Sequence, residues 1–70
     1  MYDFVVTIYY TDHIGPMKRA YFLMGPDSDT VLATARRIFL ADAEIAYDCG
    51  YGVRLIQKIE YDRKGVVFHA

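Results

Sequence analysis

Residues 2–11 alternate between two kinds of side chain, and this pattern constrains the fold more than any other feature of the chain. The even positions are large and apolar or aromatic: Tyr2, Phe4, Val6, Ile8 and Tyr10. The odd positions are more mixed: Asp3, Val5, Thr7, Tyr9 and Thr11. A period of two with aromatic and β-branched residues predicts a strand with one face on a core. The rest of the chain must therefore supply a layer that covers this face.

A second strand is predicted over residues 17–24, paired with the first as a hairpin. The intervening loop ends in Gly15-Pro16, and proline cannot donate a hydrogen bond to a strand ladder. Both faces of this strand carry large apolar side chains, so its orientation depends on Lys18, which can reach water from the start of the strand. The set expected to face the core is Ala20, Phe22 and Met24. The set expected on the other face is Arg19, Tyr21 and Leu23.

A helix is predicted from residue 28 to about Asp48. Asp27 or Ser28 can accept hydrogen bonds from its first N–H groups, and Gly50 suits the left-handed position just past its end. At about 100° per residue, the apolar side chains form one stripe. Its members are Val31, Leu32, Ala35, Ile38, Phe39, Ile45 and Ala46.

Asp42 lies near the middle of this stripe, where a bare carboxylate would be costly to bury. Three interpretations stay open. The helix bends or ends around Ala41–Asp42, or the Asp42 side chain is hydrogen-bonded or partly exposed at the sheet edge, or Asp42 is a functional carboxylate.

The remaining chain predicts a strand over residues 51–62, a tight turn over 62–65 and a short strand over 66–70. The inward set of the third strand is Val53, Leu55, Ile59 and Tyr61. The outward set is Arg54, Ile56, Lys58, Glu60 and Asp62. The element order is thus ββαββ. We predict an α+β fold in which a four-stranded antiparallel sheet, its strand order left open, carries one long helix on one face.

The length of 70 residues predicts a single domain over residues 1–70. A formal net charge of −1 argues against a strongly basic nucleic-acid neutraliser and against an acidic DNA mimic. Cys49 has no second cysteine to bond, which favours a reducing cytoplasm. The start lacks the basic and apolar regions of a signal peptide, and no apolar run approaches about 18 residues, so we expect neither a leader nor a membrane span.

No group of residues points to catalysis. His13 and His69 lack the spacing of metal ligands, and Cys49 falls at the predicted C-terminal end of the helix, where the dipole disfavours a thiolate. We therefore expect no enzyme activity, no metal, no cofactor and no small-molecule substrate.

One helix leaves the other face of the sheet uncovered, and this face is expected to carry Tyr9 and Tyr21. Tyrosine supplies a large contact area at little cost in entropy. Three occupants stay open: a second copy of the chain, a different protein, or single-stranded nucleic acid stacked on the tyrosines. In the last case the phosphates would meet Arg19, Arg54 and Lys58.

The end of the predicted helix offers a second candidate surface. Glu44 and Asp48 lie four residues apart near the negative end of the helix dipole, which is mildly unfavourable. Together with Asp42 they form an acidic set that suits a basic partner. Leu40 and Tyr47 share a solvent-facing line, and their residue types are those of interface anchors.

The stretch Ser28–Ala70 resembles small proteins carried by phages and mobile elements, some anti-CRISPR proteins among them. The resemblance is architectural. It is carried by the helix around Ala35-Arg36-Arg37-Ile38, then Val53-Arg54-Leu55-Ile56 and Gly65-Val66-Val67-Phe68. It implies a non-enzymatic inhibitor in the host cytoplasm that occupies a surface of a defence complex, often one that handles nucleic acid.

The leading hypothesis is therefore a small protein-binding module, in its narrowest form a phage-encoded inhibitor. Its expected apolar anchors are Tyr9, Tyr21, Leu40 and Tyr47. Its expected electrostatic docking set is Asp42, Glu44 and Asp48. The alternative is a nucleic-acid-binding accessory or regulatory domain that uses Arg19, Arg54 and Lys58 on the open face of the sheet.

Overall fold

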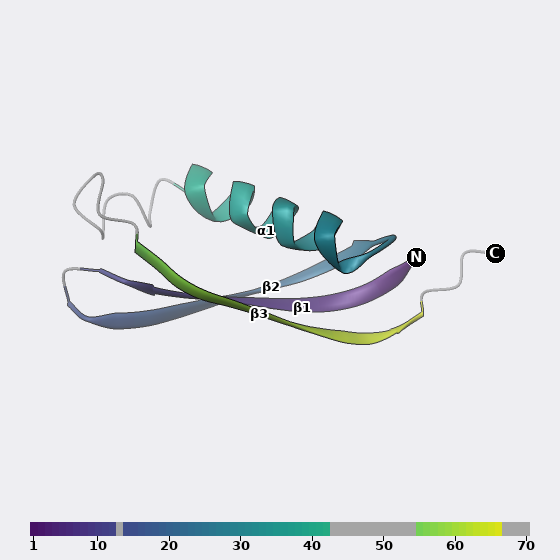
Figure 1. Cartoon of the computed structure of the whole chain (residues 1–70), viewed down its shortest axis with the longest axis horizontal. Helices are drawn as coiled ribbons and strands as arrows, with labels where there is room; N and C mark the ends of the chain where they lie inside the picture. Colours follow the sequence, from purple (N-terminus) through teal and green to yellow (C-terminus); the bar gives the residue numbers. More distant parts are fainter. Residues whose placement is uncertain (13, 43–54, 67–70) are drawn as a thin grey trace.

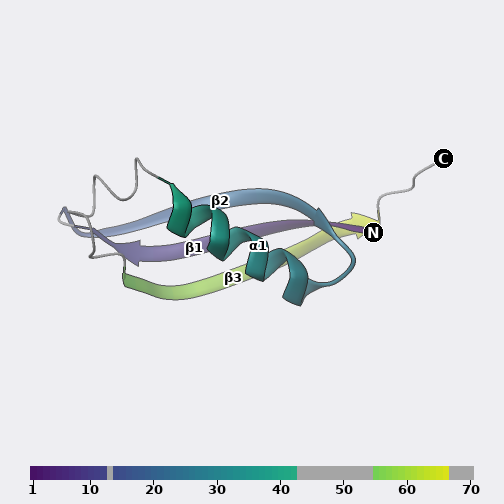
Figure 2. The same ribbon diagram turned by 90° about the horizontal axis from the view of Figure 1, so that it is seen from above.

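The computed structural model describes residues 1–12, 14–42 and 55–66. These residues form β1 (Tyr2–Thr11), β2 (Pro16–Gly25), α1 (Ser28–Ala41) and β3 (Leu55–Val66). The strands make a three-stranded antiparallel sheet in the order β2-β1-β3. The helix crosses one face of this sheet (Figures 1 and 2). The α+β class is confirmed. The described residues show three strands where the sequence predicts four.

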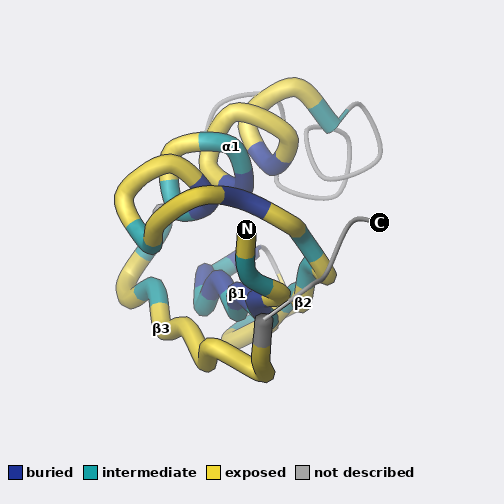
Figure 3. Tube along the Cα trace, turned by 90° about the vertical axis from the view of Figure 1, so that its right-hand side faces the viewer, coloured by how far each residue is buried: buried dark blue, intermediate teal, exposed yellow. Residues whose placement is uncertain are grey.

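The central strand β1 supplies most of the core, as its alternation predicts. Four of its even positions are buried, namely Phe4, Val6, Ile8 and Tyr10. From the helix, Val31, Ala35 and Phe39 are buried against them, because a spacing of four residues keeps them on one stripe. Figure 3 shows this burial concentrated on β1 and on the sheet-facing side of α1.

The hairpin of β1 and β2 is closed by a loop around Asp12. The buried Asp12 carboxylate accepts hydrogen bonds from the N–H groups of Ile14 (2.7 Å) and Gly15 (3.0 Å). Gly15 has a φ of 139°, a conformation that a residue with a Cβ rarely adopts. The loop fixes Thr11 opposite Pro16, and the register runs without a slip to Tyr2 opposite Gly25.

The predicted orientation of β2 is wrong. Phe22 is 82% exposed and Met24 56% exposed, whereas Tyr21 and Leu23 pack against the core. The reason is the hairpin register, which places Tyr21 opposite buried Val6 and Phe22 opposite Val5. Residues directly opposite each other in a sheet share a face, so one register step reverses every side chain of a strand.

The predicted turn over residues 62–65 is also wrong, because β3 continues through it. Arg63 lies opposite Phe4 and Gly65 lies opposite Asp3, which leaves Lys64 as the extra residue of a bulge. Gly65 has a φ of 155° and so serves this irregular stretch of strand instead of a hairpin turn. Val66 belongs to β3, and the rest of the predicted last strand, 67–70, lies outside the described residues.

A second bulge lies at the other end of β3. Tyr10 pairs with Ile56 and Tyr9 with Lys58, so Gln57 is the extra residue. The bulge turns Ile56 toward the core, against the prediction that it faces outward. Ile59 and Tyr61 lie on the helix side, as predicted, opposite Ile8 and Val6 of β1.

The helix begins as predicted and ends earlier than predicted. The Asp27 side chain accepts a hydrogen bond from the Thr30 N–H at 2.8 Å, which is N-cap geometry. At the other end Asp42 has an extended conformation, and its N–H donates to the Phe39 carbonyl at 3.2 Å. The continuation predicted as far as Asp48, with Ile45, Ala46 and Gly50, lies outside the described residues.

A candidate protein-binding surface on the open sheet face

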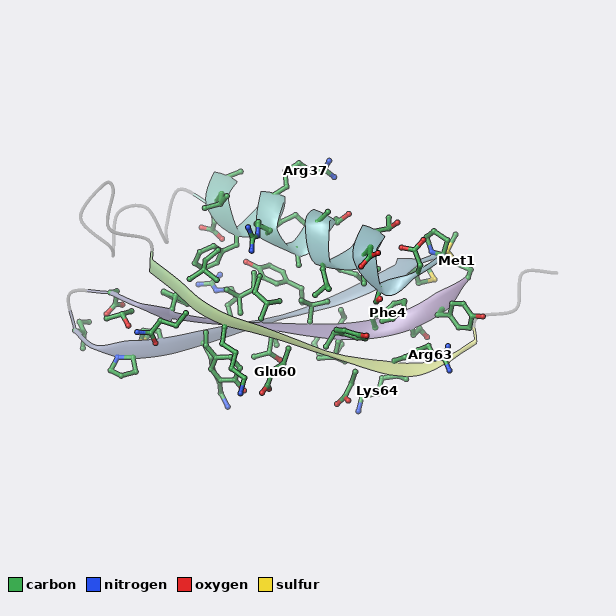
Figure 4. All side chains as sticks on the ribbon, viewed as in Figure 1. Met1, Phe4, Arg37, Glu60, Arg63 and Lys64 are labelled. Atoms are coloured by element: carbon green, nitrogen blue, oxygen red, sulfur yellow. The ribbon has the colours of Figure 1, made fainter. Side chains whose placement is uncertain are left out.

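The face of the sheet opposite α1 is not covered by any described element. β1 contributes Val5, Thr7 and Tyr9 to it, and the cross-strand register adds residues of both neighbours. Those of β2 are Lys18, Ala20, Phe22 and Met24. Those of β3 are Lys58, Glu60 and Asp62. In Figure 4, Glu60 points away from the helix, whereas Phe4 lies between sheet and helix. We call this set of residues the open face.

One half of the open face is apolar. Phe22 and Met24 project from β2 beside half-buried Val5 of β1. A groove of about 480 Å³ lies among them. Its lining is Asp3, Phe4, Val5, Phe22, Leu23, Met24 and Lys64. An apolar floor with one acidic and one basic residue among its lining has the composition of a protein interface.

The other half of the open face is a compact polar cluster. The Tyr9 hydroxyl donates to Glu60 Oε2 at 3.1 Å, and Lys58 Nζ lies 2.6 Å from Glu60 Oε1. Lys58 Nζ also lies 5.6 Å from the centre of the Tyr9 ring. The hydrogen bond from Lys58, with that from Tyr9, lowers the pKa of Glu60, and the bond to Glu60 raises the pKa of both Lys58 and Tyr9. The positive charge of Lys58 is therefore matched within its own chain.

Two of the predicted site residues, Arg19 and Tyr21, lie on the helix side of the sheet instead of on the open face. Arg19 Nη1 donates to Asp42 Oδ2 at 3.4 Å, with both side chains partly buried. This contact confirms the interpretation of a hydrogen-bonded Asp42 at the sheet edge. The C-cap geometry of Asp42 separately confirms that the helix ends there. Tyr21 packs against the core, and burial raises the pKa of its hydroxyl. The buried Tyr21 oxygen has no hydrogen-bond partner among the described residues.

The other predicted site residues are divided between described and undescribed parts of the chain. Tyr9 and Lys58 lie on the open face, as expected. Leu40 is 49% exposed on α1, far from that face. Four further residues lie outside the described ranges: Glu44, Tyr47, Asp48 and Arg54. The acidic docking set is thus represented in the described structure by Asp42 alone.

Phe22 and Met24 are the surface residues that the sequence prediction missed. A signal for them was present in the hairpin loop. If Thr11 and Pro16 close the loop, counting away from the loop along both strands places Phe22 opposite Val5. Phe22 then shares the face of β1 that carries its odd-numbered residues. The apolar character of both faces of β2 hid this signal.

A scan against protein-family models finds no match, and searches of curated proteins and of solved structures find none either. Within residues 1–12, 14–42 and 55–66, no helix is long and apolar enough to cross a membrane. The function of the chain is therefore argued from the chemistry of its surface.

Proposed function

We propose that the chain is a protein-binding module whose open face docks a protein partner, with Phe22 as the central anchor. The observation that carries this proposal is the 82% exposure of Phe22 beside Val5 and Met24. Scattered exposed apolar residues are normal on protein surfaces, but neighbouring ones on an uncovered sheet face favour an interface. Aromatic anchors in apolar grooves carry much of the affinity of such contacts.

The charges of the open face favour a protein over a nucleic acid. Lys58 is paired with Glu60 at 2.6 Å, and the neighbouring Lys64 lies 3.6 Å from Asp62. Among the described residues, these pairs leave Lys18 as the single unpaired lysine of the open face. Arg19, another cation of the nucleic-acid hypothesis, bonds Asp42 on the helix side. Non-specific affinity for nucleic acid comes mainly from cations that neutralise phosphates, and paired cations contribute little of it.

The narrower role, an inhibitor carried by a phage that occupies a host defence complex, rests on the architectural resemblance. In this role the partner would offer an apolar side chain to the groove beside Phe22, with polar groups for the cluster around Glu60. The partner's identity separates this role from that of a general adaptor.

The proposal is tested by affinity capture with three tagged forms of the chain: wild type, Phe22→Ser and Ile14→Ser. Ile14 is the matched control, because it is 78% exposed but lies in the hairpin loop. We expect wild type and Ile14→Ser to retain a stoichiometric protein from nuclease-treated lysate of the source cells. Phe22→Ser should retain at least about tenfold less, as expected for loss of a hot-spot residue.

Two results would overturn the proposal. One is equal capture by Phe22→Ser and wild type, with both variants folded by circular dichroism. The other comes from a parallel capture without nuclease: recovery of nucleic acid alone, lost after nuclease treatment or in high salt, would favour the alternative function.

A further inference from the structure

The two outer edges of the sheet are protected to very different degrees. The edge strand β3 contains two bulges and many charged side chains. Those within it are Lys58, Glu60, Asp62, Arg63 and Lys64. Charges and bulges on an edge strand are features that prevent pairing with another chain.

The edge strand β2 lacks this protection over half of its length. The segment Ala20–Met24 has no charge and no proline, and the β1–β2 register runs without a bulge. Within the described residues β2 has a strand neighbour on one side only, because it ends the order β2-β1-β3. In Figure 2 the helix crosses the sheet diagonally and leaves the outer edge of β2 open toward its Gly25 end. Such an edge presents free N–H and C=O groups to an incoming strand.

We propose that two copies of the chain pair through this edge, with β2 antiparallel to β2 of the second copy. The result is one continuous six-stranded sheet formed from two three-stranded sheets. The contact is isologous, so the same residues serve both copies about a twofold axis.

The charge distribution along β2 argues for a second copy as the occupant. Both cations of the strand, Lys18 and Arg19, lie in its first half, and the second half is neutral. Antiparallel pairing therefore places the cations of each copy beside the neutral half of the other. A parallel arrangement would place like charges side by side. The formal net charge of −1 adds little repulsion between copies.

Side-chain size and the position of Pro16 select the register. With the axis at Tyr21, Lys18 lies opposite Met24 of the second copy, and Phe22 lies opposite the small Ala20. Every opposed pair shares a face in this register, as an antiparallel sheet requires. Pro16, which has no N–H to donate, falls just beyond the paired segment.

This pairing is independent of the protein-binding role of the open face, because it uses the backbone edge of β2. It also places the two Phe22 side chains on one continuous face, close to the axis. A partner protein would then meet two copies of the apolar half of the open face.

The test is the molar mass of the full chain, measured by light scattering after size exclusion over a range of concentrations. We expect a dimer for wild type, for Ile14→Lys and for Val5→Lys. Phe22→Lys should shift the dissociation constant upward by at least about tenfold, because it places a charge beside the axis. Val5 lies inside the open face and away from the β2 edge, so Val5→Lys separates edge pairing from face-to-face stacking.

A wild-type monomer at concentrations up to about 1 mM would overturn the inference, since a Kd of that size would already populate the dimer. So would a dimer that is lost in Val5→Lys, because that result identifies stacking of two open faces. Loss of a captured partner in Val5→Lys with the dimer intact would support both proposals. An intact dimer with no captured partner would refute the open-face function alone.

Spin labels give the register directly. Labels at residue 18 of the two copies should lie about 20 Å apart along the strands. Residue 18 of one copy lies opposite residue 24 of the other copy, and six positions at roughly 3.4 Å separate residue 24 from residue 18. Labels at residue 20 should lie much closer. A reversed order of these two distances would exclude the antiparallel register about Tyr21.

Discussion

At the scale of single residues, aspartates hold the ends of the secondary-structure elements. Asp12 closes the hairpin loop through two backbone N–H groups, and Asp27 caps the first turn of α1. Asp42 ends α1 and bonds Arg19 of β2. The carboxylates of Asp12 and Asp27 accept from backbone N–H groups that the hairpin loop and the first turn of the helix would otherwise leave unpaired. Asp42, the described member of the acidic set that the sequence suggests for docking, thus has a structural role.

The cap at Asp27 makes helix stability depend on pH. The backbone N–H of Thr30, together with its side chain, lowers the pKa of Asp27 from its ordinary value. The stabilisation is therefore complete above the unfolded-state pKa, near 4, and is lost as the pH falls through the lower folded-state pKa. We expect Asp27→Ala to melt several degrees below wild type at pH 7, with the difference shrinking toward pH 2.

The matched control for the cap is Asp27→Asn, which keeps an acceptor oxygen but no titrating group. Its melting temperature should lie between those of wild type and Asp27→Ala at pH 7. A difference between wild type and Asp27→Ala that stays constant from pH 7 to pH 2 would contradict this account.

The Tyr21 hydroxyl is a polar group whose removal should stabilise the chain. Its oxygen is buried with no hydrogen-bond partner among the described residues, and burial raises its pKa. An unpaired buried polar group costs roughly 1–3 kcal/mol. We expect Tyr21→Phe to increase the free energy of unfolding by up to about 1 kcal/mol in urea titrations. A decrease would show that the hydroxyl makes a stabilising contact in solution.

At the scale of elements, the close approach of β2 to α1 sets how the helix sits on the sheet. Gly25 is buried at the end of β2, and a Cβ built on it would lie 2.6 Å from Cγ1 of Val31. Real Cβ contacts are essentially never shorter than 3.0 Å. Val31 is itself 1% exposed, so it has little room to move. The absence of a side chain at Gly25 therefore permits the helix to pack here.

Gly25→Ala should accordingly destabilise the fold by about 1–3 kcal/mol, the usual cost of overpacking. A double-mutant cycle with Val31→Ala tests the cause, because shortening Val31 removes the atom that the new methyl group would strike. We expect the double variant to lose less than the sum of the single losses. Strict additivity of the two losses would refute the contact with Val31 as the cause of the destabilisation.

At the scale of the whole molecule, the sheet has one face that holds the chain together and one that is free to bind. Phe39 and Phe22 show the contrast, since Phe39 is fully buried and stacks edge to face on Tyr10 at 4.9 Å between ring centres, whereas Phe22 projects into solvent. A domain of this size has a total stability of only a few kcal/mol.

The same change at these two positions should therefore have opposite consequences. Phe39→Ala is expected to cost about 3–5 kcal/mol, which is enough to unfold much of the protein. Phe22→Ala should change the free energy of unfolding by no more than about 0.5 kcal/mol. Chemical denaturation of both variants measures the difference, and similar losses at the two positions would refute the orientation of β2.

Local chemistry was sufficient to predict several features of the chain. The alternation in residues 2–11 identified β1 and its core positions Phe4, Val6, Ile8 and Tyr10, which the structure confirms. The cap candidates Asp27 and Ser28 and the apolar spacing of Val31, Ala35 and Phe39 predicted the start and the buried stripe of α1, and the structure selects Asp27 as the cap. These features depend on residues a few positions apart, whose relative placement within a strand or helix is fixed by backbone geometry.

The orientation of β2, the length of β3 and the end of α1 were decided by tertiary structure. Each depends on residues far apart in the chain: the register of Phe22 on Val5, the pairing of Arg63 with Phe4, and the contact of Arg19 with Asp42. β2 has large apolar groups on both faces, so its own pattern could not select one. The alternation of residues 2–11 therefore predicts which strand forms the core, whereas the register imposed by the hairpin loop selects the aromatic residues that remain on the surface.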